Sequence, residues 1–326
     1  MKHRKKEPVT VFLFGGLLVL ASFLRWPGGA AAISLPECIS DSGADPQSFI
    51  DSAPCGAYGV VTTRTKLVDG VPKEIKVQFM VHEPSGSPKA LVVLFAGGNG
   101  NTGITLNAGG ALTAGRNFLV RSAQLFAERG YKAVTIDRPL LELGPPKVPE
   151  FPTIPDYDLY RVSTDHRIDI EAVLAAVDAP GLPVFFAGTS RGTLSAVAQH
   201  SLSLALSLSS AVTSGTNLYI GHPDRPNLQP GSVSVPVRIL AHEQDGCSVT
   251  APQNAVKLHV AFKQAEVDSH YNSVDGGFDL TGQTVDGVTI AACDALTHHG
   301  YLGIENEAVD QITKRFDQIL RRLNKS

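Results

Sequence analysis

The residue with the clearest chemical context in this sequence is Ser190, which stands between two glycines in the pattern G-T-S-R-G. The apolar stretch 182–188 precedes the pattern, and the helix-compatible stretch 191–201 follows it. A serine at such a strand-to-helix turn sits on a sharp, strained bend that projects its hydroxyl above the sheet. Gly188 and Gly192 lack a Cβ and leave room for this bend. The pattern predicts a nucleophilic serine, and an ordinary strand-to-helix turn is the alternative.

A nucleophilic serine needs a histidine base, and the base needs a carboxylate that orients it. Asp245 lies in the loop after the predicted strand 235–242, and Glu243 in the same loop is the fallback. His298 and His299 precede the last helix, so the chain order is serine, acid, histidine. We predict His299 as the base, because Gly300 beside it lets the loop turn tightly and aim the ring. His298 is the alternative base.

Acyl transfer by serine also needs backbone N–H groups that stabilise the developing oxyanion. One is expected from Arg191, the residue after the nucleophile. The second is expected from the glycine-rich segment 96–100, which follows a buried strand and lets the backbone approach a substrate closely. Gly98 is the predicted donor and Gly97 the next choice. The Arg191 side chain is expected to lie along the surface of its helix rather than on the substrate.

Other polar residues near these motifs are predicted to be structural. Arg121 lies on an otherwise apolar helix face, and Arg161 precedes the next helix. We expect these two arginines to pair with Asp137 or Asp165. The remaining histidines of interest are expected to be structural or exposed: His166, His200, His222, His242 and His259.

The sequence has four cysteines, an even number that favours disulfides in an exported chain. Cys38–Cys55 and Cys247–Cys293 is the local pairing among three possible connectivities. Cys247 is two residues after Asp245, so its bridge would tie the loop that carries Asp245 (the acid loop) to the loop that carries His299 (the base loop). Two separate buried thiols are the alternative for this pair. No Cys/His spacing typical of a zinc site is present, and no metal is expected.

The elements that position these residues alternate between strands and helices. Residues 57–84 predict a β-hairpin that turns at Asp69-Gly70. Such alternation is typical of a mostly parallel sheet with helices on both faces. Two proline-rich loops, 139–160 and 215–234, interrupt it, but neither is long enough for a full cap domain. Further strands are expected in 89–98, 131–139, 182–188, 204–215 and 235–246, and helices in 117–130, 165–177, 191–201 and 306–324.

The N-terminal residues 1–32 resemble a signal peptide, with a basic start, an apolar run and an A-x-A-like cleavage site. An uncleaved anchor is the alternative. We therefore expect a secreted or periplasmic protein, with an N-terminal extension at 33–57 and a catalytic domain at 58–326. The net charge of −3 does not indicate nucleic-acid binding. No stable membrane insertion is expected if the signal is cleaved.

The segment 98–103 offers a rival interpretation, because Gly98, Gly100 and Gly103 form G-x-G-x-x-G after a buried strand. In a dinucleotide-binding fold this pattern opens directly into a helix, and an acidic residue about 20 positions later ends a second strand. Here more glycines follow, and Glu128 falls near the end of a predicted helix. A dinucleotide-binding or non-catalytic α/β protein therefore remains only a distant alternative, and no cofactor is expected.

Together these segments resemble the α/β-hydrolase superfamily, over about residues 58–324. The resemblance is carried by "LVVLFAGGNG", "AVTIDRP", "VFFAGTSRGTLSA", "ILAHEQDGC" and "THHGYLG". It is strongest to uncharacterised exported bacterial serine hydrolases that combine G-T-S-R-G, D-x-C and H-G motifs. It implies a central sheet of about eight strands and a triad of Ser190, Asp245 and His299. One departure is Ala96, where many members have a histidine before the glycines.

The chemistry expected from these residues is hydrolysis of a small-molecule acyl substrate, with an ester as the preferred bond. Ser190 would form an acyl-enzyme that water then resolves. A peptidase or amidase, or an activity like that of dienelactone hydrolases, is the alternative on the same triad. The superfamily fold hosts many such reactions, so it does not identify the substrate.

Overall fold

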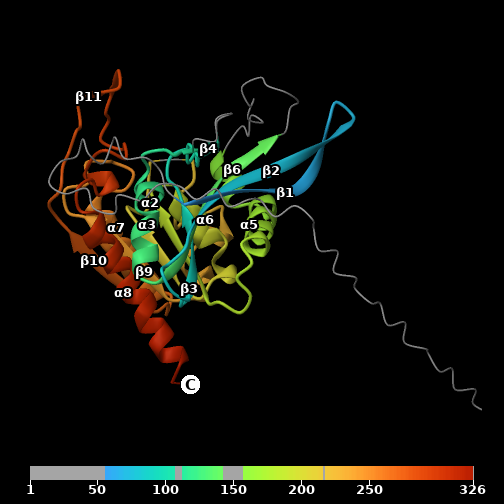
Figure 1. Ribbon diagram of the computed structural model, residues 1–326. Coiled ribbons are helices and arrows are strands. Elements are labelled where there is room, and N and C mark those ends of the chain that lie inside the picture. Colours follow the sequence, from blue (N-terminus) through green and yellow to red (C-terminus); the bar gives the residue numbers. More distant parts are fainter. Residues whose placement is uncertain (1–55, 107–111, 142–156, 216, 326) are drawn as a thin grey trace, which may run out of the picture. The chain divides into compact units, whose positions relative to one another are not determined.

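The buried strands pair into an eight-stranded sheet, as expected (Figure 1). The computed structural model describes residues 56–106, 112–141, 157–215 and 217–325. The strand order is β1-β2-β6-β3-β7-β8-β9-β10. In this sheet β2 pairs antiparallel with β1 and with β6, and the other neighbours are parallel. The strands are β1 (Ala57–Val68), β2 (Val71–His82), β3 (Ala90–Phe95), β6 (Tyr131–Leu141), β7 (Val184–Thr189), β8 (Leu206–Ser209), β9 (Val237–His242) and β10 (Ser269–Val274).

The hairpin β1–β2 turns at the predicted dipeptide. Asp69 and Gly70 have φ angles of 51° and 76°. Positive φ at both central residues is the signature of the type I′ turn, whose twist matches that of the flanking strands. In Figure 1 the tip of this hairpin extends beyond the rest of the sheet. The opening antiparallel edge is thus built by local turn chemistry.

Helices cover both faces of the sheet, as the alternation of elements indicates. One hydrophobic cluster joins the strands to α2 (Phe118–Arg121), α3 (Ala123–Glu128) and α8 (Glu305–Leu323). A second cluster joins the opposite face to α5 (Thr164–Ala176), α6 (Gly192–Ala198) and α7 (Pro252–Gln264). All six residues of β3 are buried, because a central parallel strand is covered on both faces.

The structure corrects several expected elements. The helix expected over 117–130 is divided at Ser122 into α2 and α3, and only Leu206–Ser209 of the expected strand 204–215 forms β8. Helix α7 and strand β10 were not predicted. Strand β10 lies at the edge of the sheet and has a mostly polar sequence, SHYNSV, so no continuous apolar run marks it. Short pairs also form, β4 (Thr105–Leu106) with β5 (Leu112–Thr113) and β11 (Thr284–Val285) with β12 (Val288–Thr289).

The two proline-rich loops contribute no large cap within the described residues. The first leads into the short helix α4 (Tyr157–Arg161), while residues 142–156 lie outside the described part. The second contains only the 3₁₀ turns η2 (Pro226–Leu228) and η3 (Pro230–Ser232) in 217–234. Further 3₁₀ turns are η1 (His200–Leu202) and η4 (His298–Gly300).

The N-terminal features stay predictions. The signal sequence 1–32, nearly all of the extension 33–57, and both Cys38 and Cys55 lie outside the described residues. Among the helices that are described, none combines the length and the apolar character needed to cross a membrane.

Candidate active site

Ser190 occupies a strained bend between β7 and α6. Its φ angle is +51°, in the left-handed region that residues with a side chain rarely adopt. Its N–H donates to Ser209 O at 3.0 Å, which ties the bend to the end of β8. Its carbonyl accepts from the Thr193 backbone N–H at 3.0 Å and from the Thr193 hydroxyl at 2.6 Å. These bonds hold the backbone of Ser190 on both sides.

The glycines around Ser190 are required by close packing of backbone on backbone. A Cβ on Gly188 would lie 2.5 Å from Gly192 O. A Cβ on Gly192 would lie 2.0 Å from Phe95 O, at the end of the neighbouring strand β3. Neither obstacle is a side chain that could rotate away. The G-x-S-x-G pattern is therefore the steric condition for placing α6 against the ends of β7 and β3.

His299 lies in the turn η4, and its backbone is held at both polar groups. Its N–H donates to Thr297 Oγ1 at 3.1 Å, and its carbonyl accepts from Ser210 Oγ at 3.1 Å. A Cβ on Gly300 would lie 2.0 Å from Ala295 O. The glycine beside the base is thus needed for space in a crowded loop, and it is Tyr301 that has the positive φ, 57°.

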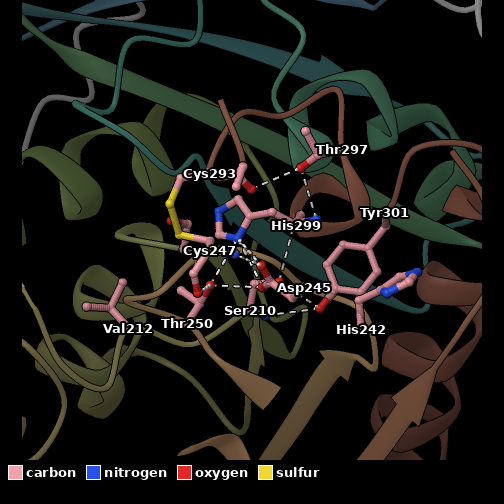
Figure 2. Close-up of polar contacts among 12 residues, drawn as sticks. Ser210, Val212, His242, Asp245, Cys247, Thr250, Cys293, Thr297, His299 and Tyr301 are labelled. Carbon is pink, nitrogen blue, oxygen red and sulfur yellow. Dashed lines mark hydrogen bonds and ion pairs between the residues drawn. A yellow bond between two sulfur atoms is a disulfide. The ribbon is translucent and has the colours of Figure 1, made fainter. Parts of the chain in front are cut away.

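Asp245 meets His299 in a buried polar cluster (Figure 2). The Nδ1 atom of His299 lies 3.1 Å from Asp245 Oδ2 and 3.2 Å from Oδ1. Thr250 Oγ1 donates to Oδ2 at 2.8 Å and lies 3.0 Å from His299 Nδ1. The Cys247 N–H donates to Oδ1 at 2.9 Å. A carboxylate at Nδ1 keeps the proton there, so the other ring nitrogen, Nε2, is free to accept one.

The alternative acid and base point elsewhere. Glu243 Oε1 accepts from Ser273 Oγ at 2.8 Å, on the exposed edge beside β10. The ring of His298 stacks on His242, with centroids 4.4 Å apart, and its Nδ1 lies 3.7 Å from Asp279 Oδ2. Of the residues proposed from the sequence, the structure brings Asp245 and His299 together and leaves Glu243 and His298 outside the cluster.

Two ring side chains, Tyr301 and His242, support the loops that carry the acid and the base. Tyr301 OH accepts from Ser210 N at 3.0 Å and donates to Leu240 O at 3.0 Å, and burial raises the pKa of this phenol. His242 accepts from Gln244 N at Nδ1, so its Nε2–H donates to Gly276 O at 2.9 Å. Burial lowers the pKa of His242, which favours this neutral, doubly bonded ring. Tyr301 thus links the ends of β8 and β9, and His242 links the acid loop that follows β9 to the segment after β10.

The predicted disulfide between Cys247 and Cys293 is present and joins the acid and base loops across 46 residues of sequence. Figure 2 shows it beside His299. Asp245, Cys247 and His299 place ligand-type atoms within 4.8 Å of one another, but this sulfur is already bonded to Cys293. The cluster is therefore unsuited to holding a metal through its cysteine. The Cys38–Cys55 pairing lies outside the described residues and stays a prediction.

Ser190 and His299 line the same cavity, of about 30 Å³. Gly97 and Gly98, the predicted oxyanion-hole glycines, also line it; a Cβ on Gly97 would lie 2.9 Å from Ser190 Cβ. Arg191 is the N-cap residue of α6, and its side chain extends to Asp158 Oδ2 at 3.4 Å, as expected for a surface position. The remaining lining residues are Asn117, Phe118, Thr189, Cys293, Ala295 and Gly300.

Arg161 supports the glycine-rich segment 96–100 (the glycine loop), a role that sequence reasoning missed. This buried guanidinium donates to Ala96 O at 2.9 Å and to Gly98 O at 3.3 Å, and also to Ser195 Oγ at 2.9 Å. By holding these carbonyls on its own side, Arg161 limits the orientations open to the peptide groups of the loop. No spacing rule connects residue 161 with residues 96–98, so only the fold reveals this contact.

The expected partners of Arg121 and Arg161 were wrong. Arg121 binds Glu305 Oε1 at 2.9 Å and Gly300 O at 2.5 Å, which joins α2 to the base loop. It is Arg64 that pairs with Asp165, at 2.9 Å, and it also binds Asp169. The sequence places Arg121 on an otherwise apolar helix face, but the choice of partner depends on which distant elements meet.

The structure disfavours the dinucleotide-binding interpretation of Gly98, Gly100 and Gly103. Within residues 96–106 and 112–117 the chain forms turns and the short strands β4 and β5, and the next helix is α2. Glu128 ends α3 rather than a strand. A Cβ on Gly100 would overlap the Tyr157 ring, which gives this glycine a packing role.

Comparisons with known proteins support the fold. No family model matches the sequence, and no curated protein sequence matches it. Among solved structures, Pyrococcus horikoshii acylaminoacyl peptidase matches with a TM-score of 0.51 at 12% identity, covering 81% of this chain and 42% of that one. An α/β serine hydrolase without a lid from Xanthomonas campestris gives 0.47 at 13%, covering 79% and 94%. A thermophilic esterase from Thermogutta terrifontis gives 0.46 at 16%, covering 81% and 94%. The strand order and the match at a TM-score of 0.51 show that the chain has the α/β-hydrolase fold.

Proposed function

We propose that this chain is a serine hydrolase that cleaves carboxylic esters through Ser190, His299 and Asp245. One observation carries the proposal. The strained Ser190 opens onto the same cavity as His299, whose Nδ1 lies 3.1 Å from the buried carboxylate of Asp245. A serine, a histidine and an orienting acid in this relation are the groups that acyl transfer requires.

In this mechanism Ser190 Oγ attacks the acyl carbon while His299 Nε2 takes the serine proton. Asp245 holds the proton on Nδ1 and stabilises the imidazolium that forms. His299 then gives its proton to the leaving group, and an acyl-enzyme remains on Ser190. Water, activated by the same histidine, resolves the ester bond and regenerates the serine. Thr250 positions the pair through its bonds to Asp245 and His299.

The oxyanion hole is proposed from the backbone N–H groups of Gly98 and Arg191. Gly98 lines the cavity, and Arg191 directly follows the nucleophile as the N-cap residue of α6. Removing one donor from such a site typically slows the reaction by about 100-fold or more. Arg161 acts on this hole indirectly, because it binds the carbonyls of Ala96 and Gly98.

An amide substrate is the second candidate, because one structural neighbour is named an acylaminoacyl peptidase. The triad chemistry is the same for both bonds, but an amide needs protonation of a poorer leaving group. Comparing p-nitrophenyl acetate with a p-nitroanilide of an N-acylated amino acid separates the two. Ester cleavage without anilide cleavage supports the first candidate.

The test of the proposed function is the variant Ser190→Ala. We expect it to fold with an unchanged circular dichroism spectrum and to lose turnover of p-nitrophenyl acetate. Thr193→Ser is a matched control on the same turn, because it keeps the hydroxyl that bonds to Ser190 O. Full activity in Ser190→Ala would contradict the assignment of the nucleophile.

We also propose that the protein is exported. The basic and apolar pattern of residues 1–32 and the disulfide beside the site support this, because disulfides persist in oxidising compartments. Expression of the full chain followed by N-terminal sequencing of the extracytoplasmic protein tests it. A new N-terminus near Ala32 supports cleavage, and an intact Met1 on membrane-bound protein supports an anchor.

A further inference from the structure

We propose that the side-chain amide of Asn117 is a further donor to the oxyanion, beside the backbone N–H groups of Gly98 and Arg191. Asn117 precedes α2 and lines the cavity that contains Ser190 and His299. It is far from the serine in sequence and belongs to none of the motifs. This inference rests on the proposed serine hydrolase mechanism, because it assigns a role in stabilising that transition state.

The orientation of the amide follows from its contact with α2. Asn117 Oδ1 accepts from the Leu119 N–H at 3.2 Å as the helix cap. Only the oxygen of the amide can accept from a backbone N–H, so Oδ1 must face the helix. Nδ2 then projects from the opposite side of the planar group. Nδ2 has no protein acceptor among the described residues, so its two N–H groups are available to a ligand.

The position of Nδ2 relative to Ser190 is fixed by Gly97 between them. A Cβ built on Gly97 would lie 3.3 Å from Asn117 Nδ2 and 2.9 Å from Ser190 Cβ. The amide nitrogen and the serine therefore flank one atom-sized space at the glycine loop. The absence of a side chain at Gly97 keeps this space open. An acyl oxygen bound at Ser190 would lie within reach of the amide.

Asn117 is also held rigidly, as preorganised stabilisation of a transition state requires. Its backbone carbonyl accepts from Val120 N and Arg121 N, both at 3.0 Å. The next side chain, Phe118, is buried against the Tyr301 ring, with centroids 4.7 Å apart. The donor thus sits on a buried element that also contacts the residue after the base loop.

The chemistry requires an N–H donor whose bond strengthens as negative charge develops on the acyl oxygen. Removing a group of this kind lowers kcat and leaves KM nearly unchanged, because the group binds the ground-state carbonyl more weakly than the transition-state oxyanion. A side-chain amide in such a role contributes about 100-fold or more to the rate. A purely structural cap would leave both constants unchanged as long as the cap is retained.

The variants Asn117→Asp and Asn117→Ser separate the two roles, because Asp and Ser cap helices about as well as Asn but lack its amide N–H groups. With p-nitrophenyl acetate we expect kcat to fall about 100-fold in Asn117→Ser, with KM and melting temperature unchanged. Asn117→Asp should lose at least as much, since it places a negative charge beside the oxyanion. The rate of Ser190 labelling by a fluorophosphonate should fall in parallel.

Ser163→Ala is the matched control, since Ser163 caps α5 by accepting from His166 N. It should lower the melting temperature by a few degrees and leave kcat unchanged. Wild-type kcat and labelling rate in Asn117→Ser would overturn the role of Asn117 alone. A wild-type protein that neither turns over the ester nor reacts at Ser190 would overturn both proposals, so the two failures are distinguishable.

Discussion

The two halves of the site are held together by different forces. The nucleophile half, at Ser190, is fixed by backbone packing: Gly188 and Gly192 fit against backbone carbonyls with no space for a Cβ. The acid–base half is fixed by side chains from separate loops, through the bonds of Asp245, Thr250 and His299 and through a disulfide. One half is contiguous in sequence, and the other is assembled from residues about 50 positions apart.

This difference determines how each half should fail. A steric error in the nucleophile half has no local remedy, because the obstacle is backbone, so the fold itself should weaken. A lost hydrogen bond in the acid–base half leaves the sheet intact, so activity should fall before stability does. Steric errors in the nucleophile half should therefore reduce mainly stability, and lost hydrogen bonds in the acid–base half should reduce mainly activity.

Within the acid–base half, the largest expected effect on activity is that of Asp245→Asn. Asparagine keeps the shape but favours the wrong imidazole tautomer, so kcat should fall by about 10⁴-fold. The melting temperature should change little beside this loss. Glu243→Gln, on the exposed edge, is the control and should keep its activity. Equal kcat losses in the two variants would refute the choice of Asp245 as the acid.

The largest expected effect on stability is that of Gly192→Ala, whose Cβ would lie 2.0 Å from Phe95 O. We expect the free energy of unfolding to fall by about 3 kcal/mol, measured by urea denaturation. Gly86→Ala is the control, because no atom lies within 4 Å of its Cβ position and its φ is not in the left-handed region. A Gly192→Ala protein as stable as Gly86→Ala would contradict the packing account.

The disulfide should stabilise the acid–base half more than the nucleophile half. Replacing both Cys247 and Cys293 by Ala should lower the free energy of unfolding by about 2–4 kcal/mol. Activity should fall at the same time, since the acid and base loops lose their covalent tie. The double replacement of Cys38 and Cys55 by Ser tests the other predicted pair and should leave kcat unchanged. An active, fully stable Cys247/Cys293 variant would show that the hydrogen bonds suffice.

A smaller, pH-dependent effect is expected on the nucleophile side from His166. This ring is buried between Phe95 and Tyr160, and burial together with nearby Arg161 lowers its pKa to about 3. The unfolded chain binds the proton below about pH 6.5, so stability is complete above that pH and declines as the pH falls toward 3. The loss should reach about 2 kcal/mol at pH 5.

The measurement is urea denaturation between pH 7.5 and pH 5 for the wild type and His166→Leu. The variant should lose this part of the pH dependence, while His200→Gln, at a partly exposed position, should retain it. Identical slopes in the wild type and His166→Leu would show that the buried ring does not contribute to acid sensitivity.

Local signals in the sequence predicted much of the fold. Continuous apolar runs marked β3, β7 and β9, and Asp69-Gly70 marked the hairpin. The edge strand β10 was missed because its sequence, SHYNSV, is mostly polar and only its first and last residues are buried. The helix before it, α7, buries only a narrow apolar stripe and was missed as well.

The candidate site was predictable where residue type and chain order carried the information. The Ser–Asp–His order limited the acid to Asp245 or Glu243 and the base to His299 or His298, and the structure places Asp245 and His299 together. Arg161, Thr250 and Asn117 could not be predicted, because their roles depend on contacts between distant segments. Arg161 was even expected to pair with a carboxylate, whereas it binds the carbonyls of the glycine loop.

The central claim is that Ser190 is activated by His299 across the shared cavity. Incubation with a fluorophosphonate probe, followed by peptide mass spectrometry, tests it most directly. We predict one adduct on wild-type protein, on the peptide containing Ser190, with labelling abolished in Ser190→Ala and strongly slowed in His299→Ala. An adduct at the same rate in His299→Ala, or none on folded wild-type protein, would contradict the account.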